Sequence, residues 1–317
     1  MVDTDTTRRS FLKQSLNVGG AMFAAEVGAL EALAGTLPSG YRQSGSLMRF
    51  GLVTYLWGKD WDLPTLIRNC EKAKAFGVEL RTQHAHKVEA DLSPQQRKEV
   101  KKRFDDSPVV FVGPGCNFAF HYPDKAKVKQ EIEGAKQYVK LSHDCGGSGL
   151  KVKPNGLPKG VPVEKTCEQI AKSLNMLGRY AADYGQEIRV EVHGSGTNDL
   201  PIMKKIFDRV TERNVAVCWN CNHQDLKGGG LEYNFDLVKN RLATTCHIHA
   251  INGEKYHYPY QQLMNLLVKM DYKGWILIEA HGKPKNPAKA LAEQCEIWTK
   301  MIADTQKKLH LPPIKIK

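Results

Sequence analysis

The chain has 317 residues, a formal net charge of +12 and 41% hydrophobic residues. Once a leader-like first segment is set aside, about 280 residues remain, which suits one large α/β barrel better than two domains. The basic residues are not gathered into a stripe with interleaved aromatics, so the charge does not indicate nucleic-acid binding. Beyond the first segment no stretch is apolar enough for a transmembrane helix, and we expect no stable membrane insertion.

The first residues read as an export signal. Residues 7–13, with the sequence TRRSFLK, match the twin-arginine pattern, and a modestly apolar segment rich in Ala and Gly follows. We therefore expect a twin-arginine leader over residues 1–35, a linker over 36–47 and a single catalytic barrel over 48–317. The expected location is the periplasm or the cell envelope. An ordinary amphipathic helix start is the alternative for the first segment.

From residue 48 onward, short β-rich runs alternate with longer helical patterns. Strands are predicted at residues 48–54, 77–81, 109–113, 149–153, 187–193, 215–222, 244–251 and 275–281. Helices are predicted at residues 64–76, 94–104, 124–145, 162–184, 199–211, 235–242, 259–270 and 288–309. This alternation predicts a parallel sheet, and eight such units close into a (β/α)8 TIM barrel of the α/β class. The rival, an open doubly wound sheet, would have a glycine-rich phosphate turn after the first strand, and TYLWG is not one.

The chain has eight cysteines. Several lie inside apolar runs, where cysteine commonly acts as a small buried hydrophobe. Because the twin-arginine route carries proteins that have already folded, no disulfides are needed. We expect mostly buried thiols.

The last four predicted strands carry polar side chains near their ends, where a strand packed between helices and core should be apolar. Side chains alternate between the two faces of a strand, so the apolar residues face the helices and the polar ones face the barrel interior. The inward set is Glu191, His193, Asn220, His247, His249, Glu279 and His281. Burying carboxylates and imidazoles together is costly unless a charge neutralises them. A divalent ion such as Mn, Zn, Co or Mg suits these ligands, and a metal-free hydrogen-bonded network is the alternative.

Two earlier strands also direct charged residues inward. Glu79 and Arg81 share the inward face of the second strand, and Lys151 and Lys153 share that of the fourth. Contact with a substrate and a salt bridge at the rim are both consistent with this pattern.

At these residues the sequence resembles the xylose isomerase-like TIM-barrel superfamily, and within it the sugar phosphate isomerase/epimerase-type proteins that often carry a twin-arginine leader. The resemblance covers roughly residues 48–308. It implies one divalent metal ion held by Glu191, Asn220, His249 and Glu279. Asn220 stands where the family pattern has Asp, which removes one negative charge. His193 or Asn222 could then supply a further ligand.

The resemblance also implies a metal-dependent sugar isomerase or epimerase with a small carbohydrate substrate. An enediolate would form at the metal, with Glu191 and Glu279 as catalytic acid and base. The expected substrate-binding residues are His193, His223, Glu79, Arg81, Lys153 and His281.

Two other functions stay open. A lyase or hydratase acting on 3-keto-glycosides would use the same enediolate. An inactive carbohydrate-binding barrel would account for the change from Asp to Asn. No oligomeric state is predicted.

Overall fold

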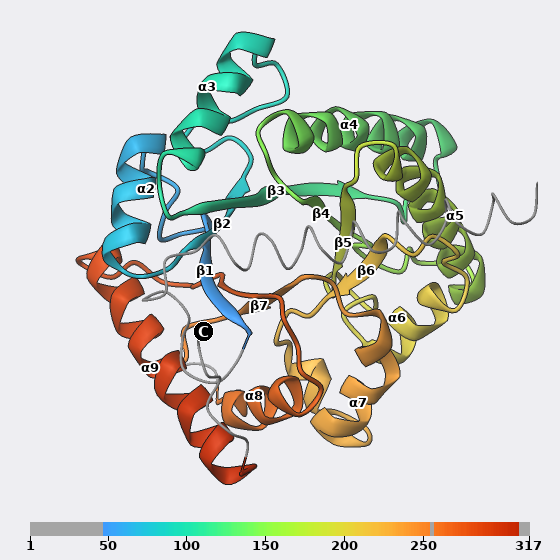
Figure 1. The fold of residues 1–317 in the computed structure, drawn as a ribbon. Helices are drawn as coiled ribbons and strands as arrows, with labels where there is room; N and C mark the ends of the chain where they lie inside the picture. Colours follow the sequence, from blue (N-terminus) through green and yellow to red (C-terminus); the bar gives the residue numbers. More distant parts are fainter. Residues whose placement is uncertain (1–46, 254–256, 311–317) are drawn as a thin grey trace, which may run out of the picture. The chain divides into compact units, whose positions relative to one another are not determined.

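The computed structural model describes residues 47–253 and 257–310, all within one compact unit of the chain. Eight parallel strands run around a central barrel with helices outside them (Figure 1). The strands are β1 (Arg49–Val53), β2 (Gly77–Arg81), β3 (Val110–Ala119), β4 (Gly149–Lys153), β5 (Glu187–Glu191), β6 (Val215–Cys218), β7 (Thr245–Ile248) and β8 (Trp275–Ile278). The predicted (β/α)8 barrel is confirmed. The predicted leader lies outside the described residues.

The sheet order is β6-β5-β4-β3-β2-β1-β8-β7, so the barrel is completed between β6 and β7. Here Val217 pairs with Leu242 in an isolated parallel bridge, and Ala243 N–H donates to Val217 O at 2.8 Å. Farther along, His247 N–H donates to Trp219 O at 2.7 Å. These bonds bring the two ends of the sheet together and make the barrel nearly closed.

Helices α2 to α9 connect the strands and cover the outside of the barrel. They are α2 (Leu63–Lys72), α3 (Pro94–Asp105), α4 (Lys125–Asp144), α5 (Val163–Ala182), α6 (Leu200–Phe207), α7 (Gly230–Val238), α8 (Tyr260–Lys269) and α9 (Pro287–Lys308). Several begin with an oxygen-bearing cap and an early proline. Ser93, for example, forms a capping box with Gln96 at the start of α3.

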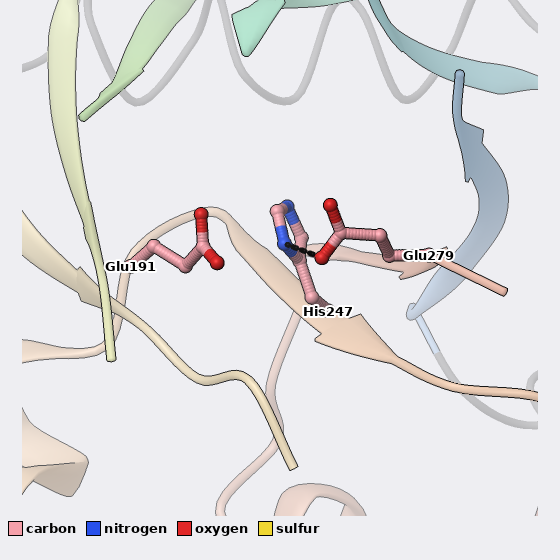
Figure 2. A group of neighbouring side chains, drawn as sticks. All are labelled: Glu191, His247 and Glu279. Atoms are coloured by element: carbon pink, nitrogen blue, oxygen red, sulfur yellow. Dashed lines mark ion pairs between the residues drawn. The ribbon is translucent and has the colours of Figure 1, made fainter. Parts of the chain in front are cut away.

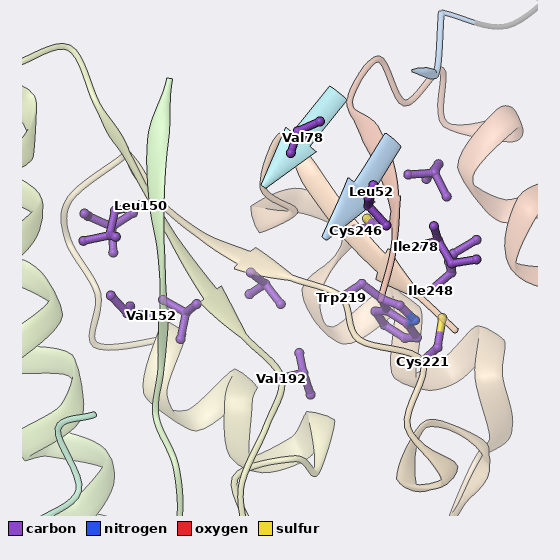
Figure 3. Close-up of a cluster of buried hydrophobic side chains, with 14 of the residues drawn as sticks. Leu52, Val78, Leu150, Val152, Val192, Trp219, Cys221, Cys246, Ile248 and Ile278 are labelled. Atoms are coloured by element: carbon purple, nitrogen blue, oxygen red, sulfur yellow. The ribbon is translucent and has the colours of Figure 1, made fainter. Parts of the chain in front are cut away.

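The apolar side chains of the strands pack between the sheet and the helices. Val152, Ile248 and Ile278 belong to this buried cluster (Figure 3). Each is a sequence neighbour of inward polar residues, so the period-two alternation of the strands separates core from barrel interior as predicted. All eight cysteines are buried.

Strand β3 runs to Ala119, six residues beyond the predicted end at residue 113. The Gly-Pro-Gly sequence there looks like a turn, but Leu80 pairs with Pro114 and Arg81 with Gly115, next to a register shift. A Cβ on Gly115 would lie 2.4 Å from Glu79 Oε1. Glycine is therefore needed for the strand to pass this buried side chain.

Other predicted boundaries are also wrong. Strands β5 to β8 end two to four residues earlier than predicted, and their last polar residues lie in the segments that follow. Helix α7 begins at Gly230 rather than at residue 235, and a separate 3-10 helix, η3 (Lys239–Arg241), follows it. A second 3-10 helix, η2 (His223–Leu226), was not predicted.

Candidate active site

A cavity of about 320 Å³ lies among the carboxyl ends of the strands. Its lining is polar, with four histidines, two carboxylates and two cationic side chains. The lining residues are Tyr55, Arg81, Lys153, Glu191, His193, Asn220, Cys221, Asn222, His223, Gln224, His249, Glu279 and His281. Glu79 is the one predicted site residue outside this lining.

Glu191, the last residue of β5, lies between two lysines and is only 1% exposed. Its Oε2 is 2.7 Å from Lys151 Nζ and 3.7 Å from Lys153 Nζ. Its Oε1 accepts a hydrogen bond of 3.2 Å from Asn220 Nδ2. Both lysines come from β4, where alternate residues point inward. The carboxylate thus has two ion-pair partners and one hydrogen bond, and its Oε2 is buried without a hydrogen-bond partner in the described structure.

Glu279 directly follows β8 and has a different set of partners. Its Oε1 lies 2.9 Å from Arg81 Nη1, while Arg81 Nη2 donates to Asn117 Oδ1 at 3.1 Å. Its Oε2 lies 3.7 Å from His247 Nδ1, and His247 Nε2 lies 3.2 Å from Glu79 Oε2. A chain of ionisable groups thus leads from the cavity into the barrel interior.

Glu191, His247 and Glu279 point toward one another (Figure 2). Their ligand atoms lie within 4.8 Å of one another, and all three residues are buried. His247 Nδ1 and Asn220 Oδ1 are buried without a hydrogen-bond partner in the described structure. Carboxylate, imidazole and amide donors of this kind fit a divalent ion. The predicted ligand His249 is outside this group of three, and its Nδ1 lies 3.1 Å from the backbone carbonyl of Glu279.

The surrounding charges keep both carboxylates ionised. Burial alone would raise the pKa of Glu191, but Lys151 and Lys153 outweigh it and bring this pKa to about 2. Burial likewise opposes ionisation of Glu279, yet His247 and Lys151 hold its pKa below the usual value. At neutral pH both groups are carboxylates that can accept a proton.

Imidazole rings surround the opening of the cavity. His193 Nδ1 lies 2.8 Å from Asn155 Oδ1. The rings of His249 and His281 have centroids 4.8 Å apart, and Tyr55 meets His281 edge-on at 5.5 Å. Such groups offer donors and acceptors to the hydroxyls of a sugar.

The segment after β6 is held by a buried carboxyl group. Cys221 has a positive φ of 50°, which turns the chain so that Asn222 and His223 also line the cavity. Asp225 Oδ2 accepts hydrogen bonds from the Asn222 N–H at 2.9 Å and from the Tyr258 hydroxyl at 2.8 Å. Burial raises the pKa of Asp225 to about 7. The positions of the cavity residues on this segment therefore depend on Asp225.

Several polar residues at the site were not among the predicted site residues. The period-two pattern placed Lys151 and His247 on inward faces, as the structure does, but the sequence analysis assigned neither of them a role in the site. Asn117 lies in the part of β3 beyond the predicted end of the strand, and Asn155 follows β4. Neither asparagine stands out in the sequence.

Two comparisons bear on what kind of protein this is. The family model described as the xylose isomerase-like TIM barrel matches residues 67–301, most of the chain. The chain belongs to this family. None of the helices among the described residues of this xylose isomerase-like barrel is long and apolar enough to cross a membrane.

Two inosose dehydratases of Bacillus cereus are similar to this xylose isomerase-like barrel in sequence. One is 24% identical over 179 residues, which is 48% of this chain and 59% of the relative. The other is 21% identical over 197 residues, which is 50% of this chain and 65% of the relative. The match thus spans less than two thirds of either relative.

Several solved structures share the fold. L-ribulose 3-epimerase matches with a TM-score of 0.71 and 12% identity, over 83% of this chain and 97% of its own. The 3-keto-D-glucoside 4-epimerase of E. coli matches with a TM-score of 0.65 and 14% identity, over 80% and 99%. The IOLI protein, solved with a zinc atom, matches with a TM-score of 0.66 and 14% identity, over 81% and 99%. At these identities the likeness concerns the fold.

Proposed function

We propose that this protein is a metal-dependent sugar isomerase or epimerase that acts through an enediolate. The observation that carries the proposal is the pair of ionised carboxylates, Glu191 from β5 and Glu279 after β8, that line one polar cavity. Sugar epimerases among the structures of the same fold support this reaction class. The substrate would be a small carbohydrate with a carbonyl group.

A divalent ion such as Mn, Zn, Co or Mg would be held by Glu191, Glu279 and Asn220, with either His249 or His247 as the imidazole ligand. When bound, the ion would polarise a substrate carbonyl and stabilise negative charge on its oxygen. The donor atoms of Glu191, His247 and Glu279 within 4.8 Å of one another support this assignment, as does the zinc atom bound by the IOLI protein, which shares the fold.

The side chains of the protein would carry the proton transfers. One of the two glutamates removes the proton next to the carbonyl, and the other returns a proton on the opposite face or at the adjacent carbon. Arg81 and Lys153 would stabilise the developing charge on oxygen. His193, His223 and His281 would position the hydroxyl groups of the substrate. Glu79 would orient the ring of His247 through its contact with Nε2.

A lyase or dehydratase is the second candidate, and the similarity to inosose dehydratases favours it. The first step would be the same proton removal. The enediolate would then expel a group beta to the carbonyl instead of being reprotonated. An inactive carbohydrate-binding barrel is a third candidate, motivated by Asn220. We also propose export to the periplasm or cell envelope through the segment at residues 1–35.

Product analysis separates these candidates. The purified chain is incubated with a free ketose and with a 3-keto-glycoside, each with added Mn²⁺, and the products are identified by NMR. An isomerase or epimerase gives a sugar of the same mass, whereas a lyase gives an unsaturated product and a leaving group. Glu279→Gln should abolish either reaction, while Glu296→Gln on an exposed face of α9 serves as the matched control. Substrate binding without any product in the wild type would favour the binding barrel.

A further inference from the structure

Lys151 is an unusual neighbour for a carboxylate that is proposed to bind metal. Its side chain is fully buried, and its Nζ lies 2.7 Å from Glu191 Oε2. The amine also donates to the backbone carbonyl of Cys116 at 3.3 Å. Lys153, by contrast, lines the cavity and is 3.7 Å from the same oxygen. Lys151 therefore sits behind the cavity as a fixed partner of Glu191 and does not line it.

The charges of the buried site are already balanced by the protein. Three cations, Arg81, Lys151 and Lys153, face three carboxylates, Glu79, Glu191 and Glu279. The imidazole of His247 lies against two of these carboxylates as well, Glu79 and Glu279. Asn220 contributes a ligand atom but no negative charge. A divalent ion added to this set would bring two positive charges that no carboxylate of the group is left to neutralise. Uncompensated charge in a buried site is strongly unfavourable.

The contacts of Glu191 also oppose the binding of a metal ion. Its Oε2 forms a close ion pair with the amine of Lys151, and its Oε1 accepts a hydrogen bond from the amide of Asn220. A metal ion at Oε2 would lie close to the ammonium group of Lys151, and two cations on one oxygen repel each other strongly in a low-dielectric interior.

We propose that Lys151 is an internal counter-cation that competes with divalent metal ions for Glu191, so that the barrel folds without metal and binds it weakly. This inference rests on the proposed function, since it concerns the same carboxylates. It assigns Lys151 a positioning role: the lysine holds the Glu191 carboxylate in place when no metal ion is bound.

The test compares metal binding and thermal stability in the full chain. Wild type, Lys151→Met and Lys172→Met are treated with EDTA, dialysed and titrated with MnCl2 by calorimetry. Lys172 is an exposed residue of α5 and provides the matched control. We expect Lys151→Met to bind Mn²⁺ at least about tenfold more tightly than wild type and control. Its Tm should be low in EDTA and recover with Mn²⁺, whereas the Tm of wild type should be the same in EDTA and in buffer.

Equal or weaker Mn²⁺ binding by Lys151→Met would overturn the inference. So would a wild-type protein that unfolds or loses much of its Tm when metal is chelated, and this second readout decides the matter even if the variant does not fold. Lys151→Gln, which keeps a hydrogen-bond donor but no charge, should behave like Lys151→Met. Sugar conversion is measured separately on the same samples: its absence in every sample, with and without Mn²⁺, contradicts the proposed function and leaves the affinity result standing.

Discussion

Replacing Glu191 with Gln keeps the size of the side chain and removes its charge. In the wild type this charge lies 2.7 Å from Lys151 Nζ and 3.7 Å from Lys153 Nζ, in a side chain that is 1% exposed. The variant leaves two enclosed ammonium groups facing a neutral amide. Breaking a buried ion pair costs about 3–5 kcal/mol, and for a domain of this size the Tm should fall by roughly 6–20 °C.

The same substitution removes a proposed proton acceptor, so turnover should fall by about 10²–10⁴-fold. The double variant Glu191→Gln/Lys151→Met separates the loss of stability from the loss of turnover. Removing both charges of the pair should restore much of the lost stability, because neither charge is left buried without its partner. It should restore none of the activity.

The assay is urea unfolding followed by circular dichroism, together with turnover of the ketose that the wild type converts. The single variants Glu191→Gln and Lys151→Met and their combination form a double-mutant cycle, measured in EDTA. If the free-energy losses of the two single variants simply add in the double variant, Glu191 and Lys151 are not coupled and the reasoning is wrong.

Three further predictions concern the surroundings of the site. The pKa of Asp225 is raised by burial from 3.8 to about 7, so the stability it contributes is lost as pH rises from about 4 to 7. In urea unfolding at pH 8, the free energy of unfolding of Asp225→Asn should therefore exceed that of the wild type by up to about 4 kcal/mol. This difference should shrink toward pH 4, and a difference that does not depend on pH would contradict the assignment. Gly115→Ala would place a Cβ 2.4 Å from Glu79 Oε1 and should cost about 1–3 kcal/mol in urea unfolding, whereas an unchanged midpoint would show that the strand can shift. Arg81→Met removes the cation 2.9 Å from Glu279 Oε1, so the pKa of Glu279 should rise and the acid limb of kcat/KM should move to higher pH; an acid limb at the wild-type position would argue against Glu279 as a base.

Much of this architecture follows from local sequence patterns. The alternation of β-rich and helical segments predicts the barrel, because each unit must bury one face against the next. The period of two along a strand predicts that Glu191, His249 and Glu279 face the interior. These inferences need only neighbouring residues, and for that reason the sequence alone supports them.

What the sequence did not predict depends on residues far apart in the chain. Lys151 and Glu191 pair because β4 and β5 are neighbours in a register that puts Lys151 opposite Arg189. Arg81 and Glu279 are 198 residues apart. His247 lies on β7 and His249 directly follows this strand, two residues further along, so the stagger of the sheet decides which one lies level with the two carboxylates. Burial and charge pairing across the barrel are properties of the assembled sheet.

The most direct test of the proposed proton transfer is solvent exchange at the carbon next to the substrate carbonyl. A ketose that the wild type converts is incubated in D2O with the Mn²⁺-supplied wild type, Glu191→Gln, Glu279→Gln and the exposed control Glu296→Gln, and deuterium is read by NMR. We predict deuterium at that carbon with the wild type and the control, and none above background with the variant that lacks the glutamate facing that proton. Exchange at the wild-type rate in both Glu191→Gln and Glu279→Gln would contradict the assignment of these two carboxylates as acid and base.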